Sequence, residues 1–595
     1  MMSYNAPVRD IAFMLEEVVG LSDIASLPGN EEVSEDLVAA ILEESAKFTS
    51  EVLAPLNFVG DQQGSQWSEE GVTTPEGWKD AYRQFTENGW NSLSFPSAYG
   101  GQDMPMCVAT AVEEMWHSSN MSFGLCPLLT KGAVDAIDHH ASDELKQTYL
   151  PNMVEGTWSG TMNLTEPQAG TDLAAIRTRA EPAGDHYLIK GQKIYITYGE
   201  HDLTENIIHL VLARLPDAPE GVKGISLFIV PKYLVNADGT LGERNDVRCV
   251  SIEHKLGIHA SPTCVMSYGD NHGALGYLVG EPHHGLMYMF TMMNQARHAV
   301  GVEGYGIAER AYQHALAYAK ERKQGKTLLG KTEDDQTIVN HPDVRRILMT
   351  MRSQIEAMRG LALESAAAFD RARKHPEAEV RERNLRRGEL LTPLVKGWST
   401  ETGVDLCSLG VQVHGGMGYI EETGAAQILR DSRITPIYEG TTAIQANDLI
   451  GRKTARDGGK GMGELMDDMR ITLNELKGES DADVAAIAIR FEHGLTAAVA
   501  ANDWLLGQND ATLPAATSVE FLMMHGRLAG AWMLARGALA ALRLKQQDQA
   551  DQAYLDTRLA MARYYADRIL PLVESSSTIV TEGAESTVSV AVAQL

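Results

Sequence analysis

The glutamate at position 439 stands in a setting that suits acid–base chemistry. An isoleucine and a tyrosine precede it, and Gly440 follows it. Pro436 ends any preceding helix and Thr441 or Thr442 is able to cap a following one, so a turn between two helices is expected. A carboxylate held among apolar groups has a raised pKa, which suits a general base. Taken alone, however, such a residue is more often a solvated surface glutamate.

Other segments have the chemistry needed to bind an anionic ligand. Residues 162–172 contain a Glu-Pro step followed by a glycine, which predicts a sharp bend with free N–H groups and two threonine hydroxyls. The pair Gly415–Gly416 allows a ligand to approach the backbone closely. The planar guanidinium of arginine suits phosphate, so Arg297 and Arg322 are candidates. A lone arginine on a helix is nevertheless usually solvated or ion-paired.

Residues 325–332 formally match GxxxxGK[ST], the phosphate-binding loop of nucleotide hydrolases. That loop needs a buried strand before it and a helix that begins at its end. Here a charged helical segment, 318–323, comes before it, and an acidic run, 333–335, comes after it. We therefore interpret the segment as a solvated loop between helices.

Composition excludes several classes of function. The 595 residues carry a formal net charge of −29, which opposes sequence-independent binding to nucleic acid or to an anionic membrane. We find no unbroken apolar stretch of the length of a membrane span and no secretory signal pattern in the first twenty residues. The five scattered cysteines indicate neither a disulfide framework nor a metal site. A cytoplasmic protein is expected.

The elements that must position these residues are predicted from apolar periodicity. The expected fold is α+β and mostly α, in four parts: an N-terminal helical domain (1–160), a β domain (161–280), a helical bundle domain that contains Glu439 (281–453) and a C-terminal helical extension (454–595). This order favours separate layers over a nucleotide-binding βαβ fold. The predicted strands are His186 to Thr197, Asn206 to Leu215, Ile225 to Val230 and Val247 to Glu253.

Two segments are harder to interpret. Residues 285–322 predict one long helix or a pair of helices, because three glycines weaken the middle. The tail, residues 575–595, is expected to be loosely structured or strand-like.

Four segments together resemble those of the acyl-CoA dehydrogenase family. They are MNLTEPQAGTD at 162–172, GQKIYIT at 191–197, Arg297 together with ERKQGK at 321–326, and the stretch 411–445, which contains QVHGGMGY and IYEGT. The resemblance extends from about Phe95 to Lys453. The length and the C-terminal helices resemble the large subfamily that includes 3-methylmercaptopropionyl-CoA dehydrogenases.

The resemblance implies an FAD-dependent enzyme that introduces an α,β double bond into an acyl-CoA thioester. Candidate substrates are 3-methylmercaptopropionyl-CoA and a fatty acyl-CoA. Glu439 matches the catalytic base of the family, and the residues matched to the substrate are Thr171, Arg297 and Gly440. The residues that match positions at FAD are Leu164, Thr165, Thr171, Tyr195, Thr197, Arg322, Gln412, Gly415, Gly416 and Thr441.

The same resemblance implies partners. Electron-transfer flavoprotein is the acceptor in the family, and a homodimer or homotetramer is expected because Arg322 matches an arginine that reaches the cofactor of a neighbouring subunit. No metal is implied. Two alternatives stay open. An acyl-CoA oxidase would share every motif, and a non-enzymatic relative would bind nucleic acid or a partner through the C-terminal domain, which the acidic net charge disfavours.

Overall fold

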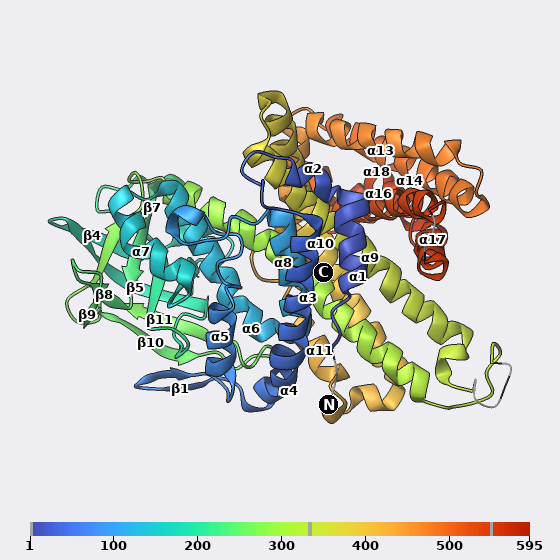
Figure 1. Cartoon of the computed structure of the whole chain (residues 1–595). Coiled ribbons are helices and arrows are strands. Elements are labelled where there is room, and N and C mark those ends of the chain that lie inside the picture. Colours follow the sequence, from blue (N-terminus) through green and yellow to red (C-terminus); the bar gives the residue numbers. More distant parts are fainter. Residues whose placement is uncertain (1–3, 331, 333–335, 548–550, 595) are drawn as a thin grey trace. The chain divides into compact units, whose positions relative to one another are not determined.

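The computed structural model describes residues 4–330, 332, 336–547 and 551–594. These residues form two compact units, each assembled from separate stretches of the chain (Figure 1). The β unit contains residues 48–104 and 119–296. The helical unit contains the described residues before 48, residues 105–118 and the residues after 296. The boundaries expected at 160, 280 and 453 remain predictions.

The β unit is built on an eight-stranded sheet with the order β10-β11-β5-β12-β7-β6-β3, in which β4 pairs with β5 and β6. Neighbouring strands are antiparallel except for β3–β6 and β4–β6. The four strands predicted from the sequence are present, each within one residue of its expected limits. The bounds are β3 (Trp158–Asn163), β4 (Arg179–Ala183), β5 (His186–Thr197), β6 (Asn206–Arg214), β7 (Ile225–Pro231), β10 (Val247–Ile252), β11 (Thr263–Tyr268) and β12 (Ala274–Leu278).

Two small antiparallel sheets and several helices complete the β unit. The small sheets are β1 (Gln66–Ser68) with β2 (Gly71–Thr73) and β8 (Tyr233–Val235) with β9 (Leu241–Arg244). Helix α5 buries residues spaced three and four apart, as an amphipathic helix does. The helices are α4 (Ala54–Gln63), α5 (Trp78–Glu87), α7 (Asp143–Glu155) and part of α6 (Met106–His140), which has a non-helical break at Asn120.

The helical unit contains α10 and the larger part of α8, which are the longest helices of the described residues. Helix α8 (Gly285–Glu321) is a single helix, which resolves the choice between one helix and two. Its glycines let it approach α10 closely, since a Cβ on Gly403 would lie 2.2 Å from the carbonyl oxygen of Gly304. The other helices are α1 (Val8–Phe13), α2 (Leu21–Ala25), α3 (Glu35–Phe48), α9 (Pro342–Lys374), α10 (Ala378–His414), α11 (Ala425–Ser432), α12 (Thr442–Asn447), α13 (Lys460–Gly478), α14 (Ala482–Leu506), α15 (Thr512–Ala516), α16 (Ser518–Lys545), α17 (Gln552–Arg568), α18 (Pro571–Glu582) and α19 (Ala584–Val588).

The prediction for the tail was wrong. Residues 575–594 lie mostly in α18 and α19, and Leu595 lies outside the described residues. Helix α18 packs on α14 and α16 and buries Val573 and Val580. The hydroxyl of Ser577 donates to the carbonyl of Ala497 on α14 at 2.8 Å. Tertiary packing therefore overrides the low helix propensity of the serines and threonines in this segment.

Helix α14 is long and apolar enough to cross a membrane by length and composition alone. It packs against α13, α16, α17 and α18 within the helical unit, and its buried residues include Val484, Ile487, Phe491 and Leu495. A core helix of a helical bundle has the same composition, so this feature is weak evidence for a membrane span.

Helix α8, and no strand, comes before the segment that matches the nucleotide-hydrolase loop. Most described residues of 325–332 are bends or irregular backbone, and Leu328 is 81% exposed. Lys331 and the acidic run 333–335 lie outside the described residues. The described part of the segment thus lacks the strand that phosphate binding requires.

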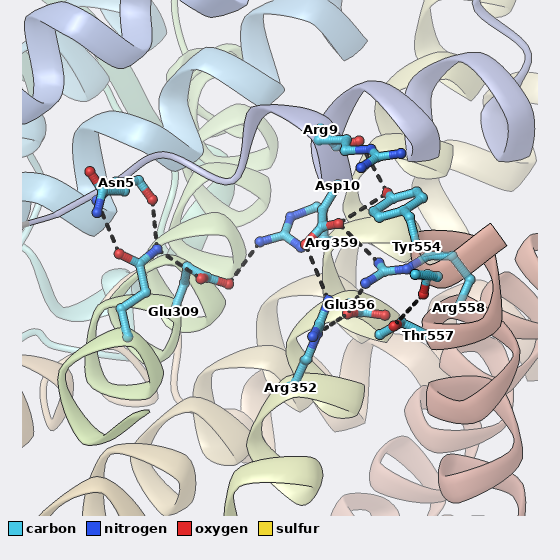
Figure 2. A network of polar contacts seen from close by, with 12 residues as sticks. Asn5, Arg9, Asp10, Glu309, Arg352, Glu356, Arg359, Tyr554, Thr557 and Arg558 are labelled. Carbon is cyan, nitrogen blue, oxygen red and sulfur yellow. Dashed lines mark hydrogen bonds and ion pairs between the residues drawn. The ribbon is translucent and has the colours of Figure 1, made fainter. Parts of the chain in front are cut away.

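A network of charged side chains joins the N-terminal segment, α9 and α17 (Figure 2). Arg558 on α17 lies 3.2 Å from a carboxylate oxygen of Asp10 and 3.1 Å from one of Glu356. Arg352 donates to Glu356 at 2.8 Å, and the hydroxyl of Tyr554 donates to Asp10 at 3.0 Å. Residues near both ends of the chain are thereby attached to α9.

Candidate active site

Glu439 lies in the turn between α11 and α12, as the sequence predicted. After α11, the N–H of Ile437 donates to the carbonyl of Ile434 at 2.8 Å, and this hydrogen bond forms the first part of the turn. Glu439 has φ 54° and Gly440 has φ 90°. A left-handed backbone is costly for a glutamate and persists only where its surroundings hold it, so this is a strained position of the kind found at functional sites.

Side chains from three helices hold this turn, two through its backbone and one through the side chain of Tyr438. The ammonium of Lys396 on α10 donates to the carbonyl of Gly440 at 2.7 Å. The amide of Gln445 on α12 donates to the carbonyl of Glu439 at 3.1 Å. The hydroxyl of Tyr438 donates to the carboxyl group of Glu303 on α8. The residues on both sides of Glu439 are therefore fixed.

The surroundings of Glu439 favour a carboxyl group that accepts a proton. Its side chain is half-buried, and burial raises its pKa above the ordinary value, while the positive charges of Arg297 and Lys396 act in the opposite direction. Arg297 is buried and lies 3.6 Å from Asp448. The structure thus brings Arg297 and Gly440 together with Glu439, which can work as a base beside two cations.

The glycine pair lies elsewhere in the helical unit. Helix α10 ends at His414, and Gly415 (φ 58°) and Gly416 begin a short 3-10 turn with nothing within 4 Å of where their Cβ atoms would lie. Gln412 is exposed, and it lies sixteen residues beyond Lys396, which is about 24 Å along the helix axis. Thr441, by contrast, is exposed beside Gly440 at the start of α12.

Arg322 is exposed just after the end of α8, where its guanidinium donates to the side chain of Gln324 at 3.5 Å. Twenty-five residues separate it from Arg297, a distance of about 37 Å along a helix. The two arginines predicted to bind an anionic ligand are therefore at opposite ends of the helical-unit part of α8.

In the β unit, the predicted bend at 162–172 is a tight turn anchored to β5. The backbones of Glu166 and Ala169 exchange two hydrogen bonds, of 3.0 and 2.9 Å. The buried carboxylate of Glu166 accepts from Lys193 at 2.8 Å and from the hydroxyl of Thr178 at 2.6 Å. Lys193 also donates to the carbonyl of Leu164 at 2.9 Å. One buried lysine thus fixes the residues that lead into the turn.

The strand that carries Tyr195 is interrupted by a β-bulge. Between Lys193 and Ile196, β5 has one residue more than β11, so the expected alternation of faces does not continue through the strand. Tyr195 has φ 60°, and the residue is 60% exposed. The N–H of Ile194 donates to the carbonyl of Thr165 at 2.9 Å, which brings this strand beside the turn. Thr197 ends β5 half-buried, and Thr171 is exposed.

Replacing Lys193 with methionine is expected to destabilise the protein by about 2 kcal/mol, because Glu166 would lose its cation while keeping other donors. Burial lowers the pKa of Lys193 to about 8 against the raising effect of Glu166. Urea unfolding measures the change in the free energy of unfolding, and the flavin content of the purified protein shows whether the turn at Glu166 still binds FAD. Lys223→Met, at an exposed position, is the control. If the two variants were equally stable, the anchoring role of Lys193 would be wrong.

Three functional residues were missed by reasoning from the sequence: Lys193, Glu303 and Lys396. The last two are charged residues in otherwise apolar helical windows, and both are fully buried. Charged side chains are rarely buried unless they are paired, so an isolated charge in such a window was a usable signal. Among the described residues, no group of three or more His, Cys, Asp or Glu side chains is placed to hold a metal ion.

Comparison with known protein families gives four matches in chain order. Residues 38–157 match the acyl-CoA dehydrogenase N-terminal domain, residues 161–270 the middle domain and residues 283–453 the C-terminal domain. Residues 465–591 match a domain described as acetyl-CoA dehydrogenase C-terminal like. The matches thus cover the helical C-terminal extension as well as the turn that contains Glu439.

Similar proteins cover nearly the whole chain. The 3-methylmercaptopropionyl-CoA dehydrogenase of Ruegeria pomeroyi is 49% identical over 98% of this chain and 99% of its own length. The broad-specificity linear acyl-CoA dehydrogenase FadE5 of Mycobacterium tuberculosis is 33% identical over 98% of each chain. A crystal structure of an acyl-CoA dehydrogenase complexed with FAD from Bacillus anthracis shares the fold, with a TM-score of 0.74, 21% identity and coverage of 96% of this chain and 91% of that one. Because these likenesses extend from end to end, the chain belongs to the acyl-CoA dehydrogenase family.

Proposed function

We propose that this acyl-CoA dehydrogenase uses Glu439 as the base that removes the α-proton of an acyl-CoA thioester. The observation that supports the proposal is the strained turn itself. Glu439 has a left-handed backbone held by Lys396 and Gln445, and its half-buried carboxyl group has a raised pKa. A general base works best when its pKa lies near the working pH.

FAD is the cofactor, and it supplies the acceptor for the hydride that leaves the β-carbon. The residues matched to it have the exposure that cofactor binding needs. The ring of Tyr195 and the hydroxyl of Thr171 are exposed, and Gly415 and Gly416 have open backbone. Leu164 and Thr165 lie in the turn anchored by Lys193. We assign these residues, with Thr197, Arg322, Gln412 and Thr441, to FAD, and Thr171, Arg297 and Gly440 to the substrate.

The positions of Arg322 and Gln412 support a homodimer or homotetramer. Both lie about 24 Å or more along their helices from the residues around Glu439. At that distance from Glu439, Arg322 and the glycine-containing turn after Gln412 are suited to bind the FAD of another subunit. Electron-transfer flavoprotein is the proposed acceptor. The five free and buried cysteines support a location in the reducing cytoplasm.

The substrate is proposed from the similarity of the whole chain. The 49% identity to a 3-methylmercaptopropionyl-CoA dehydrogenase favours a short thioether acyl-CoA over a long fatty acyl-CoA. Fatty acyl-CoA remains the second candidate, because a linear acyl-CoA dehydrogenase is 33% identical over nearly the whole chain.

Anaerobic titration of the FAD-loaded protein tests this function. We expect 3-methylmercaptopropionyl-CoA to bleach the flavin absorbance faster than butyryl-CoA or palmitoyl-CoA, and an artificial electron acceptor to sustain turnover. Equal bleaching rates with all three thioesters would contradict the proposed substrate. If none of them bleached the flavin, the proposed function would be wrong. Stoichiometric hydrogen peroxide in air would identify an oxidase.

A further inference from the structure

A second acidic residue lies behind the turn that carries Glu439. Glu303 on α8 is 0% exposed. One of its carboxyl oxygens accepts the hydrogen bond from Tyr438, the residue directly before Glu439. The other oxygen, Oε1, has no hydrogen-bond partner among the residues that the structure describes. An acidic group this deeply buried is costly unless it is neutral or well paired.

Three titratable groups act on Glu303, from the turn and from α10. Tyr438 and Glu439 face it from the turn, and Lys396 faces it from α10. Lys396 is influenced in turn by Glu401 and Arg297, and it donates to the carbonyl of Gly440. The turn is therefore held on one side through a buried acid and on the other through a buried lysine.

We propose that Glu303 is a positioning residue that, through the hydroxyl of Tyr438, orients the carboxylate of Glu439 and makes proton transfer there depend on the protonation state of a second buried acid. The inference rests on the proposed role of Glu439 as the base. It assigns to Glu303 no contact with the substrate or the cofactor.

The protonation state of Glu303 is set mainly by burial. Burial, aided by the charge of Glu439, raises its pKa to about 8, although the hydrogen bond from Tyr438 and the charge of Lys396 act in the opposite direction. Below this pH the group is neutral. Above this pH, Glu303 carries a negative charge near Glu439. This charge repels the negative charge that develops on the acyl-CoA when its α-proton is removed. Turnover is therefore expected to decline as the pH rises through about 8.

Two substitutions separate the hydrogen bond from the charge. Glu303→Gln keeps an acceptor for Tyr438 but cannot ionise, so we expect kcat at pH 7 within about threefold of the parent and a decline at high pH that moves up by about one unit or more. Glu303→Leu removes the acceptor, so we expect kcat to fall about tenfold with KM changed less than about twofold. Steady-state kinetics of the FAD-loaded enzyme from pH 6 to 9.5 give both quantities.

Further variants make the result decisive. Tyr438→Phe removes the same hydrogen bond and should reproduce the loss of kcat even if the leucine variant does not fold. Glu475→Gln, at an exposed site on α13, should leave kcat and its pH profile unchanged. Circular dichroism and flavin content confirm that each variant is folded.

The proposal fails if the Glu303→Gln variant keeps the parental decline at high pH. The decline would then be assigned to Lys396, because burial lowers the pKa of that group to about 8 as well. The proposal also fails if both Glu303→Leu and Tyr438→Phe keep the parental kcat. Glu439→Gln in the same series distinguishes the two proposals: turnover in that variant would remove the base assignment, whereas the effects at Glu303 are measured with Glu439 intact.

Discussion

Glu439→Gln is expected to lower kcat by about 10²- to 10⁴-fold while the protein still binds FAD. Glutamine has the size of glutamate but cannot take up the α-proton, and a positioned general base contributes about this much to a rate. The residue belongs to the turn held by Lys396 and Gln445, and glutamine preserves the shape of that turn. Flavin bleaching by acyl-CoA under anaerobic conditions measures the loss directly, since it does not depend on the electron acceptor.

The pH profile of the parent protein provides an independent measurement. The base works when deprotonated, and burial raises its pKa above the ordinary value, so kcat/KM should fall as the pH drops through that raised pKa. Glu422→Gln, at an exposed position before α11, is the control and should retain the parental rate and profile. Bleaching by Glu439→Gln at the rate of this control would contradict the role of Glu439.

Arg359→Met is expected to destabilise the protein by about 3 to 5 kcal/mol. Arg359 on α9 is 1% exposed, and its guanidinium donates to Glu114 on α6 at 2.6 Å and to Glu309 on α8 at 3.0 Å. Removing the arginine leaves two buried carboxylates without a cation, which is one of the most destabilising changes known for a buried ion pair. The loss is measured as a lower urea midpoint with an unchanged slope.

Two matched variants test whether the buried charges are the cause. Arg470→Met breaks an exposed ion pair with Asp467 and should cost less than about 1 kcal/mol. The double variant Arg359→Met with Glu114→Gln removes one of the stranded carboxylates and should recover part of the lost stability. If Arg359→Met cost no more than Arg470→Met, the network of Figure 2 would contribute little at Arg359.

Local patterns predicted much of the secondary structure. The limits of β5 were predicted correctly, because its Ile, Tyr and Thr residues are bounded by turn residues. The turn at Glu439 was predicted from Pro436 and from Thr441 or Thr442, which act within a few residues. The tail was predicted wrongly, because its serines and threonines favour a helix only when packed on α14 and α16.

The sequence by itself determined the family, the order of helices and strands, and the glutamate in a turn that suits a base, because each of these depends on neighbours along the chain. Only the tertiary structure brought Glu303 and Lys396 beside the turn that carries that glutamate, and Lys193 beside Glu166. These contacts join residues far apart in sequence. Their strength comes from burial, and burial is a property of the packed helices and strands that no local pattern contains.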